Sequence, residues 1–328
     1  MVLNYAKTAI LLATLTAILL FMGSLVGGQT GLLIAFGLAL VMNGVSFWKS
    51  DQLVLGMAGA KEVDRASAPD YYTLVEELAQ RAQLPMPRVY IMHSEQPNAF
   101  ATGRNPSRSA VCASTGLLSG LSREEISGVM AHELAHIKNR DTLTMTIAAT
   151  IGGAVSMLAQ WMQFGALFGG GNRNGRGGGV GWIGSLAAIL LAPLAAMLVQ
   201  MALSRSREYE ADRMGGLICG NPLWLASALQ RIHAAVSRGV PNEAAERAPA
   251  TASLYIMNPL TAGGIDNLFS THPNTENRVA ALNELAAELG ATGGRIAPTG
   301  FETAVGARPA FPELGRTRRW RGPWGSAR

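Results

Sequence analysis

Three long stretches without a charged side chain constrain the fold of this chain more than any other feature. They run from residue 8 to 48, from 142 to 171 and from 177 to 204. A segment inside a bilayer must satisfy its own backbone hydrogen bonds, so such stretches are expected to form helices. Hydrophobic residues make up 48% of the chain and charged residues only 15%, which is typical of a membrane protein. The sequence therefore predicts a mainly α-helical membrane protein.

The first stretch predicts a transmembrane hairpin at residues 1–50. The interruption Gly27-Gly28-Gln29-Thr30-Gly31 leaves two apolar halves, at about 6–26 and 31–48, each long enough to cross a bilayer. A cleaved signal peptide is the alternative, because Lys7 precedes an apolar core. That alternative leaves the second half unexplained and lacks a convincing cleavage site.

The other two stretches predict a further helix pair at residues 142–204. Its spans are expected at about 143–166 and 181–203, with Pro193 kinking the second. The alternative is a pair of buried helices in a soluble core, against which the length without any charge argues. Whether both segments fully span stays open.

The distribution of basic residues indicates which way the chain lies in the membrane. The net charge is +5, which suits an anionic lipid surface, and no basic-aromatic pattern suggests nucleic acid. The two cysteines, Cys112 and Cys219, fit buried free thiols, although a disulfide stays open. More basic residues flank one side of the predicted spans than the other, where only Arg173 and Arg176 lie. The larger set places the polar parts in the cytoplasm and comprises Lys7, Lys49, Lys61, Lys138, Arg140, Arg205 and Arg207.

The polar parts of the chain predict one α+β unit in two pieces. The first piece, residues 51–141, follows a polar connection at 49–68, and the second piece is 205–289. Residues 290–328 are rich in Gly, Pro and Arg and predict a disordered tail. Periodicity predicts helices at 70–83, 223–237 and 276–289, and strands at 88–92, 99–102 and 110–113.

The motif His132-Glu133-Leu134-Ala135-His136 predicts a metal site. Residues four apart share one face of a helix, so both imidazoles can bind one Zn²⁺, with Glu133 beside them. Ser122 and Glu125 form a capping-box pattern at the start of this helix. A chance match on an ordinary helix is the alternative, and the rest of the chain must supply a third ligand.

The segment after the last uncharged stretch carries three acidic residues at helical spacing. Glu208 and Asp212 are four apart and lie on one helical face, whereas Glu210 points nearly the opposite way. A ligand from this segment can join the His pair only if both lie on the same side of the membrane. Two crossings, or two re-entrant segments, provide that.

These blocks together resemble HtpX, the bacterial membrane-bound zinc metalloprotease family, and more distantly the CAAX prenyl endopeptidases. The resemblance covers residues 1–289 and is strongest in HELAH with the later Glu-x-x-x-Asp pattern. Four candidate spans fit HtpX better than the prenyl endopeptidases. The other matching blocks are the N-terminal hairpin, residues 98–103, residues 114–118, residues 204–212 and Thr271-His272-Pro273.

The resemblance implies a gluzincin-like α+β zinc peptidase domain with the second hydrophobic helix pair inserted between the zinc ligands. It implies one Zn²⁺ per chain, held by His132, His136 and Glu208, with Glu133 as the general base. Asp212 would orient a ligand imidazole. The alternative for Asp212 is a surface salt bridge with Arg207 or Arg213.

Two further residues receive a role only from the resemblance. Asn98 and the strand after it would hold the substrate backbone, although a plain Pro-Asn turn is equally consistent. His272 would act beside Glu133 in catalysis as a donor to the developing oxyanion, with Arg278 as an alternative donor, although His272 could simply cap the last helix. His93 and His233 are expected to be structural.

The function implied is that of a zinc metalloendopeptidase in the bacterial cytoplasmic (inner) membrane. It would be multi-pass, with its catalytic domain facing the cytoplasm, and would cleave misfolded or damaged membrane proteins in quality control and stress response. Its partners would be such substrates and the lipid bilayer. The oligomeric state and the cleavage specificity stay open. A metal-binding scaffold would need no general base, and a four-span carrier would need charges within its spans.

Overall fold

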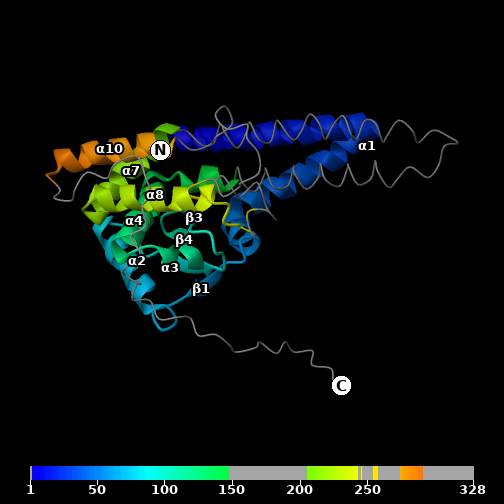
Figure 1. Ribbon diagram of the computed structural model, residues 1–328. Helices are drawn as coiled ribbons and strands as arrows, with labels where there is room; N and C mark the ends of the chain where they lie inside the picture. The colour runs from blue at the N-terminus through cyan, green and yellow to red at the C-terminus, as the bar shows by residue number, and fades with distance from the viewer. Residues whose placement is uncertain (1, 148–204, 243–244, 246–253, 258–273, 291–328) are drawn as a thin grey trace, which may run out of the picture.

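The computed structural model describes residues 2–147, 205–242, 245, 254–257 and 274–290. Seven helices and four strands have their bounds given below, and residues 142–147 are also helical (Figure 1). In chain order these are α1 (Val2–Met57), β1 (Lys61–Val63), α2 (Pro69–Arg81), β2 (Arg88–Met92), β3 (Ala99–Asn105), β4 (Arg108–Ser114), α3 (Thr115–Gly120), α4 (Arg123–Asn139), α7 (Arg205–Cys219), α8 (Pro222–Ser237) and α10 (Thr275–Glu288).

The four strands form one sheet in the order β1-β2-β4-β3. β2 pairs parallel with β4, while β1 and β3 are antiparallel to their neighbours. Alternate residues of β4 serve two buried clusters: Val111 packs in the cluster shared with α2 and α4, and Cys112 in the cluster shared with the end of α1. The sheet is therefore buried on both faces, and β3 is the edge strand beside α4.

Helix α4 is the centre of the packed unit. Ser122 accepts from the Glu125 N–H while the Glu125 side chain accepts from the Ser122 N–H, so the predicted capping box is formed. From Glu125 to Ile137 every residue is buried, because α2, α7, α8 and the sheet pack around α4. The buried surface is wider than one apolar stripe, which explains why the polar motif residues are also out of contact with solvent.

The N-terminal apolar stretch folds back on itself. Gly28 breaks α1 with φ 56° and ψ −136°, and the Asn43 side chain donates to Thr16 across the two halves at 2.8 Å. Figure 1 shows the two halves running side by side away from the α+β unit. Among the described residues, all exposed large apolar side chains except Leu217 and Leu289 lie on α1.

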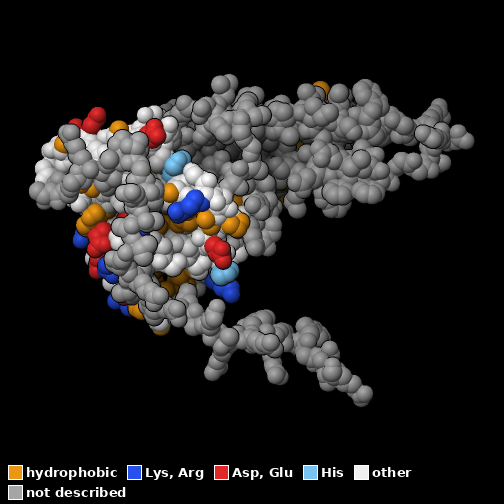
Figure 2. Space-filling model, viewed as in Figure 1, with side chains coloured by type: hydrophobic (Ala, Val, Ile, Leu, Met, Phe, Trp, Pro, Cys, Tyr) orange, Lys and Arg blue, Asp and Glu red, His pale blue; other side chains and the backbone are white. Residues whose placement is uncertain are grey.

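One part of α1 is long and apolar enough to cross a membrane. In the described part of the chain this is Gly28–Met57, and Leu12–Phe21 is a shorter apolar helix. On the face drawn in Figure 2, the acidic and basic side chains lie over the α+β unit. Exposed apolar surface on α1 and charged surface on the α+β unit together support an association with a bilayer.

Several boundaries differ from the prediction. The helix continues past residue 48 to Met57 because Val54 and Leu55 are buried against the sheet, and residues 61–63 pair with β2, so residues 49–68 are not simply a polar connection. The short strand predicted at 99–102 extends to Asn105. Of the predicted span at 143–166, only 143–147 lie in the described residues, where they are helical; the span at 181–203 and the tail at 290–328 lie outside them, apart from Gly290.

The close approach of α7 to α4 depends on Gly215. A Cβ at Gly215 would come within 2.9 Å of the backbone N and Cα of His132, closer than real Cβ contacts. His132 is on the motif helix, so α7 touches α4 at one of the motif histidines. A side chain at residue 215 would separate the helices at that point.

We expect Gly215→Ala to destabilise the protein by about 1–3 kcal/mol, because overpacking a tight helix contact costs that much. It should also lower the affinity for zinc, since α7 carries Glu208. Thermal unfolding in detergent and a zinc titration measure the two effects. Gly120→Ala is the matched control, because nothing lies within 4 Å of a Cβ there. Equal behaviour of both variants would contradict the prediction.

Candidate metal centre

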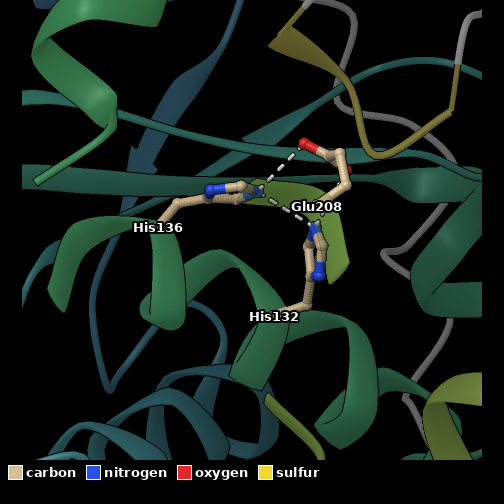
Figure 3. Close-up of side chains that lie close together, drawn as sticks. All are labelled: His132, His136 and Glu208. Atoms are coloured by element: carbon tan, nitrogen blue, oxygen red, sulfur yellow. Dashed lines mark hydrogen bonds and ion pairs between the residues drawn. The ribbon is translucent and has the colours of Figure 1, made fainter. Parts of the chain in front are cut away.

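Two histidines from α4 and one glutamate from α7 converge on a buried point (Figure 3). The Nε2 atoms of His132 and His136 are 3.1 Å apart. One Glu208 oxygen lies 3.7 Å from His132 Nε2 and the other lies 3.5 Å from His136 Nε2. The i, i+4 spacing places both rings on one face of α4, and Glu208 faces them from the first turn of α7. Glu210 is exposed, so only one of the two predicted candidates can face the rings.

The far nitrogen of each ring faces a carboxylate. His132 Nδ1 is 2.9 Å from an Asp212 oxygen, and His136 Nδ1 is 3.5 Å from an Asp141 oxygen. These partners favour the tautomer with the proton on Nδ1, which leaves an Nε2 lone pair on both rings. Two lone pairs and the Glu208 carboxylate then point at the same small volume, an arrangement suited to a cation between them.

The donor set and the local charge both suit a divalent metal. The three ligand atoms lie within 4.8 Å of one another, and two imidazoles with one carboxylate are a zinc set that leaves a fourth position open. Four carboxylates and two guanidinium groups meet around the site, leaving two negative charges when the imidazoles are neutral. These groups are Glu133, Asp141, Glu208, Asp212, Arg207 and Arg278. A dication would neutralise them.

Asp212 is held from behind by Arg278 of α10. The Arg278 Nε and Nη2 atoms donate to the two Asp212 oxygens at 2.7 and 2.6 Å, a bidentate pair buried from solvent. The alternative of a surface salt bridge from Asp212 to Arg207 or Arg213 is wrong. Arg207 lies 3.4 Å from Asp141, and Arg213 lies 3.4 Å from Glu288.

The surroundings of Glu133 raise the pKa of its carboxyl group. Burial raises the pKa of this carboxyl to about 7, and the nearby Glu208 charge adds to the effect. His136, Arg278 and the Ala101 N–H on β3 act in the opposite direction. A carboxyl with a pKa near neutrality is suited to exchanging protons with a substrate at physiological pH.

The pKa values of the two histidines and of Asp212 shift in directions that follow from their burial and their charged neighbours. Burial lowers the pKa of His132 below its usual range. Burial also opposes charge on His136, but Asp141 and Glu208 outweigh it and raise that pKa to about 9. Asp212 has a lowered pKa, because Arg278 outweighs the cost of its burial. The raised pKa values of His136 and Glu133 favour protons on both groups when no metal is bound. Those protons would offset the negative charge of the surrounding carboxylates, as a bound dication would.

The remaining predicted residues lie as follows. Asn98 is fully buried, and its Nδ2 donates to the Met257 carbonyl at 3.1 Å. Its backbone N–H donates to the Ser114 hydroxyl at 2.9 Å, so it is part of a hydrogen-bonded corner rather than a plain exposed turn. His93 and His233 are exposed and away from the ligand group. His272 lies outside the described residues.

Sequence reasoning missed two residues of the site. Asp141 follows a left-handed residue, Arg140 (φ 59°), which ends α4 and lets the Asp141 N–H donate to the His136 carbonyl. The sequence signal that could have identified Asp141 is its position just beyond the end of the motif helix. Arg278 had been considered only as a donor to substrate. Its pairing with Asp212 across 66 residues leaves no local pattern.

The raised Glu133 pKa predicts a pH-dependent stability effect in metal-free protein. The folded state favours the protonated carboxyl, so stability is lost as pH rises from the unfolded value of 4.5 through about 7. Glu133→Gln removes that loss, and its stabilisation should therefore be small at pH 5 and on the order of 3 kcal/mol at pH 8. Thermal unfolding after chelation measures it. Glu124→Gln, at an exposed position of the same helix, is the control; a pH-independent difference would contradict the assignment.

Comparison with known proteins identifies the family and includes a solved structure of similar fold. The family described as Peptidase family M48 matches residues 66–286, more than half of the chain. The crystal structure of S. mikatae Ste24p is similar with a TM-score of 0.44 and 18% sequence identity. The alignment covers 86% of this chain and 63% of that one, so this chain spans less than two thirds of that neighbour's length.

Proposed function

The chain belongs to peptidase family M48, a family of metallopeptidases, and we propose that it is a zinc-dependent endopeptidase of the bacterial cytoplasmic membrane. Its substrates would be misfolded or damaged membrane proteins, cleaved as part of protein quality control under stress. The observation that carries the activity is the convergence of His132, His136 and Glu208 beside a buried Glu133. The substrate class rests on the resemblance to HtpX and on the apolar hairpin that adjoins the site's domain.

The zinc ion would be held by the Nε2 atoms of the two histidines and by Glu208. When bound, it supplies Lewis-acid polarisation of the scissile carbonyl and a lowered pKa for water. The chain's own residues orient these ligands. Asp212 lies 2.9 Å from His132 Nδ1 and is itself fixed by Arg278, and Asp141 faces His136 Nδ1.

Glu133 would move the protons of the reaction. It lies one residue from His132 on a rigid, buried turn of α4, and its carboxylate faces the Ala101 N–H of the edge strand. As a base it would take a proton from the attacking water, and as an acid it would give that proton to the leaving amine. A pKa near neutrality serves both directions.

The substrate peptide would pair with the edge of β3 that faces away from β4. An edge strand offers unpaired backbone N–H and C=O groups, and this one runs past Glu133. Asn98 lies at the start of this edge and would hold the substrate backbone. His272, ahead of α10, is proposed as a further donor to the developing oxyanion.

The function is tested by separating the base from the ligands. Glu133→Ala should keep its zinc and lose hydrolysis of a casein-type substrate by about 10²–10⁴-fold, because only the proton transfer is removed. Glu208→Gln should lose zinc as well, while Glu210→Gln should keep both metal and activity. Metal analysis and proteolysis on the same preparations measure this.

The matched glutamates make the outcome decisive. Both are on α7, two residues apart, but only Glu208 faces the histidines. Proteolysis retained in a clean Glu133→Ala preparation would contradict the mechanism. Zinc lost from Glu210→Gln and kept in Glu208→Gln would contradict the ligand set.

The membrane topology is proposed as four spans with the α+β unit in the cytoplasm. The second half of α1 supports the first pair, since it is long enough to cross and exposes its apolar side chains. His136 and Glu208 lie together, so the chain must be on the same side of the membrane before and after the second pair. Two crossings, at about 143–166 and 181–203, would return it to that side.

Reporter fusions test this topology. Fusions after residues 60 and 290 should report the cytoplasm, and a fusion in the loop at 169–179 should report the opposite side. The reason is that two crossings separate residue 141 from residue 205. If all three report the same side, the second pair does not span the membrane. His136 and Glu208 would still lie on one side of the membrane in that case.

A further inference from the structure

A short piece of the chain lies in the place proposed for the substrate. Residues 254–257 are all buried, and they belong to no strand of the sheet: Leu254 lies in a 3₁₀ turn and residues 255–257 form a bend. They lie beside β3 and connect to it through the backbone. In Figure 3 their gold ribbon passes next to Glu208.

The backbone of this segment 254–257 uses the free edge of β3. The Ile256 N–H donates to the Ala99 carbonyl at 3.0 Å, and the Asn98 side chain donates to the Met257 carbonyl at 3.1 Å. The other edge of β3 is paired with β4. The segment therefore uses two groups at this edge, the Ala99 carbonyl and the Asn98 side chain, that an incoming peptide would also use.

A third backbone contact ties the segment to the metal centre. Arg278 Nη1 donates to the Ile256 carbonyl at 3.1 Å, and the same nitrogen lies 3.6 Å from a Glu208 oxygen. One guanidinium group thus separates this peptide carbonyl from a ligand carboxylate. The contact places the Ile256–Met257 peptide bond, on the C-terminal side of Ile256, toward the metal centre rather than at a remote end of the edge.

The side chains of the segment fill pockets on both faces of the sheet edge. Tyr255 packs edge-on against Phe100, with ring centroids 5.4 Å apart, in the cluster on the α1 side. Ile256 is 2% exposed and packs in the opposite cluster, which α4 and α10 share. An aliphatic side chain is therefore accommodated next to the metal centre.

We propose that segment 254–257 occupies the substrate-binding edge as a built-in competitor, and that the pocket holding Ile256 selects an aliphatic residue in the substrate. This inference rests on the proposed peptidase function and specifies what that site accepts. A substrate must bind extended, displace the segment, and place an aliphatic side chain where Ile256 lies. A polar residue at that position would be buried without a partner.

The test is the binding of a fluorescein-labelled peptide with the sequence of residues 253–258, Ser-Leu-Tyr-Ile-Met-Asn. It uses the full chain in detergent with Glu133→Gln, so that the peptide is not hydrolysed, and fluorescence anisotropy with and without added zinc. Ile256→Ala weakens the chain's own segment and should tighten peptide binding at least tenfold, since the binding-competent fraction rises. Ile218→Ala, the same deletion at a buried position ten residues beyond Glu208 on α7, should leave the affinity unchanged.

A second measurement does not depend on any change in the segment. The same peptide with aspartate in place of its isoleucine should bind at least tenfold more weakly to the chain with an intact segment. Equal binding of both peptides overturns the pocket assignment. The proposal that segment 254–257 competes with substrate is overturned by either of two results. One is equal peptide affinity of the Ile256→Ala chain and the chain with an intact segment. The other is an equal gain in peptide affinity from Ile218→Ala.

Hydrolysis of the unlabelled peptide by the chain with Glu133 intact separates this inference from the proposed function. If peptide binding depends on Ile256 but the peptide is not hydrolysed, the competing role of the segment is supported and the peptidase function is contradicted. If the peptide is hydrolysed but its affinity does not depend on Ile256, the peptidase function is supported and the competing role is contradicted.

Discussion

The close packing of α7 on α4 is the contact on which the rest of the site depends. Gly215 lets the two backbones meet at His132, and α7 then presents Glu208 to the histidine pair and Asp212 to the far side of one ring. Helices are rigid over two turns, so this one contact sets three positions at once. It also explains how ligands 72 residues apart in the chain, His136 and Glu208, form one site.

Buried charge is the second constraint on this centre. Four carboxylates gathered around two imidazoles would repel one another in a low-dielectric interior. Arg278 and Arg207 offset part of that charge, and a dication would offset the rest. Without a metal, the raised pKa values of His136 and Glu133 would let protons take the same role. Binding of a dication would then release protons from this centre.

Local chemistry explains which elements were predictable. The capping box at Ser122, the four-residue spacing of the histidines and the proline and glycine punctuation act within a few residues, so the helix α4 and the strand β2 were predicted closely. The extension of α1 to Met57 and the pairing of β1 depend on burial of Val54 and Leu55 against a sheet formed later in the chain. No local pattern carries that information.

The sequence by itself determined which groups meet at the site: two imidazoles and a carboxyl group on one helical turn, and a glutamate whose helical phase separates it from Glu210. Only the tertiary structure decided the support for that chemistry. The bidentate hold of Arg278 on Asp212, the position of Asp141 beneath His136 and the docking of Ile256 on the edge of β3 join distant segments. Such contacts arise from packing in three dimensions, where burial makes each unpaired polar group costly, and neither spacing nor composition encodes them.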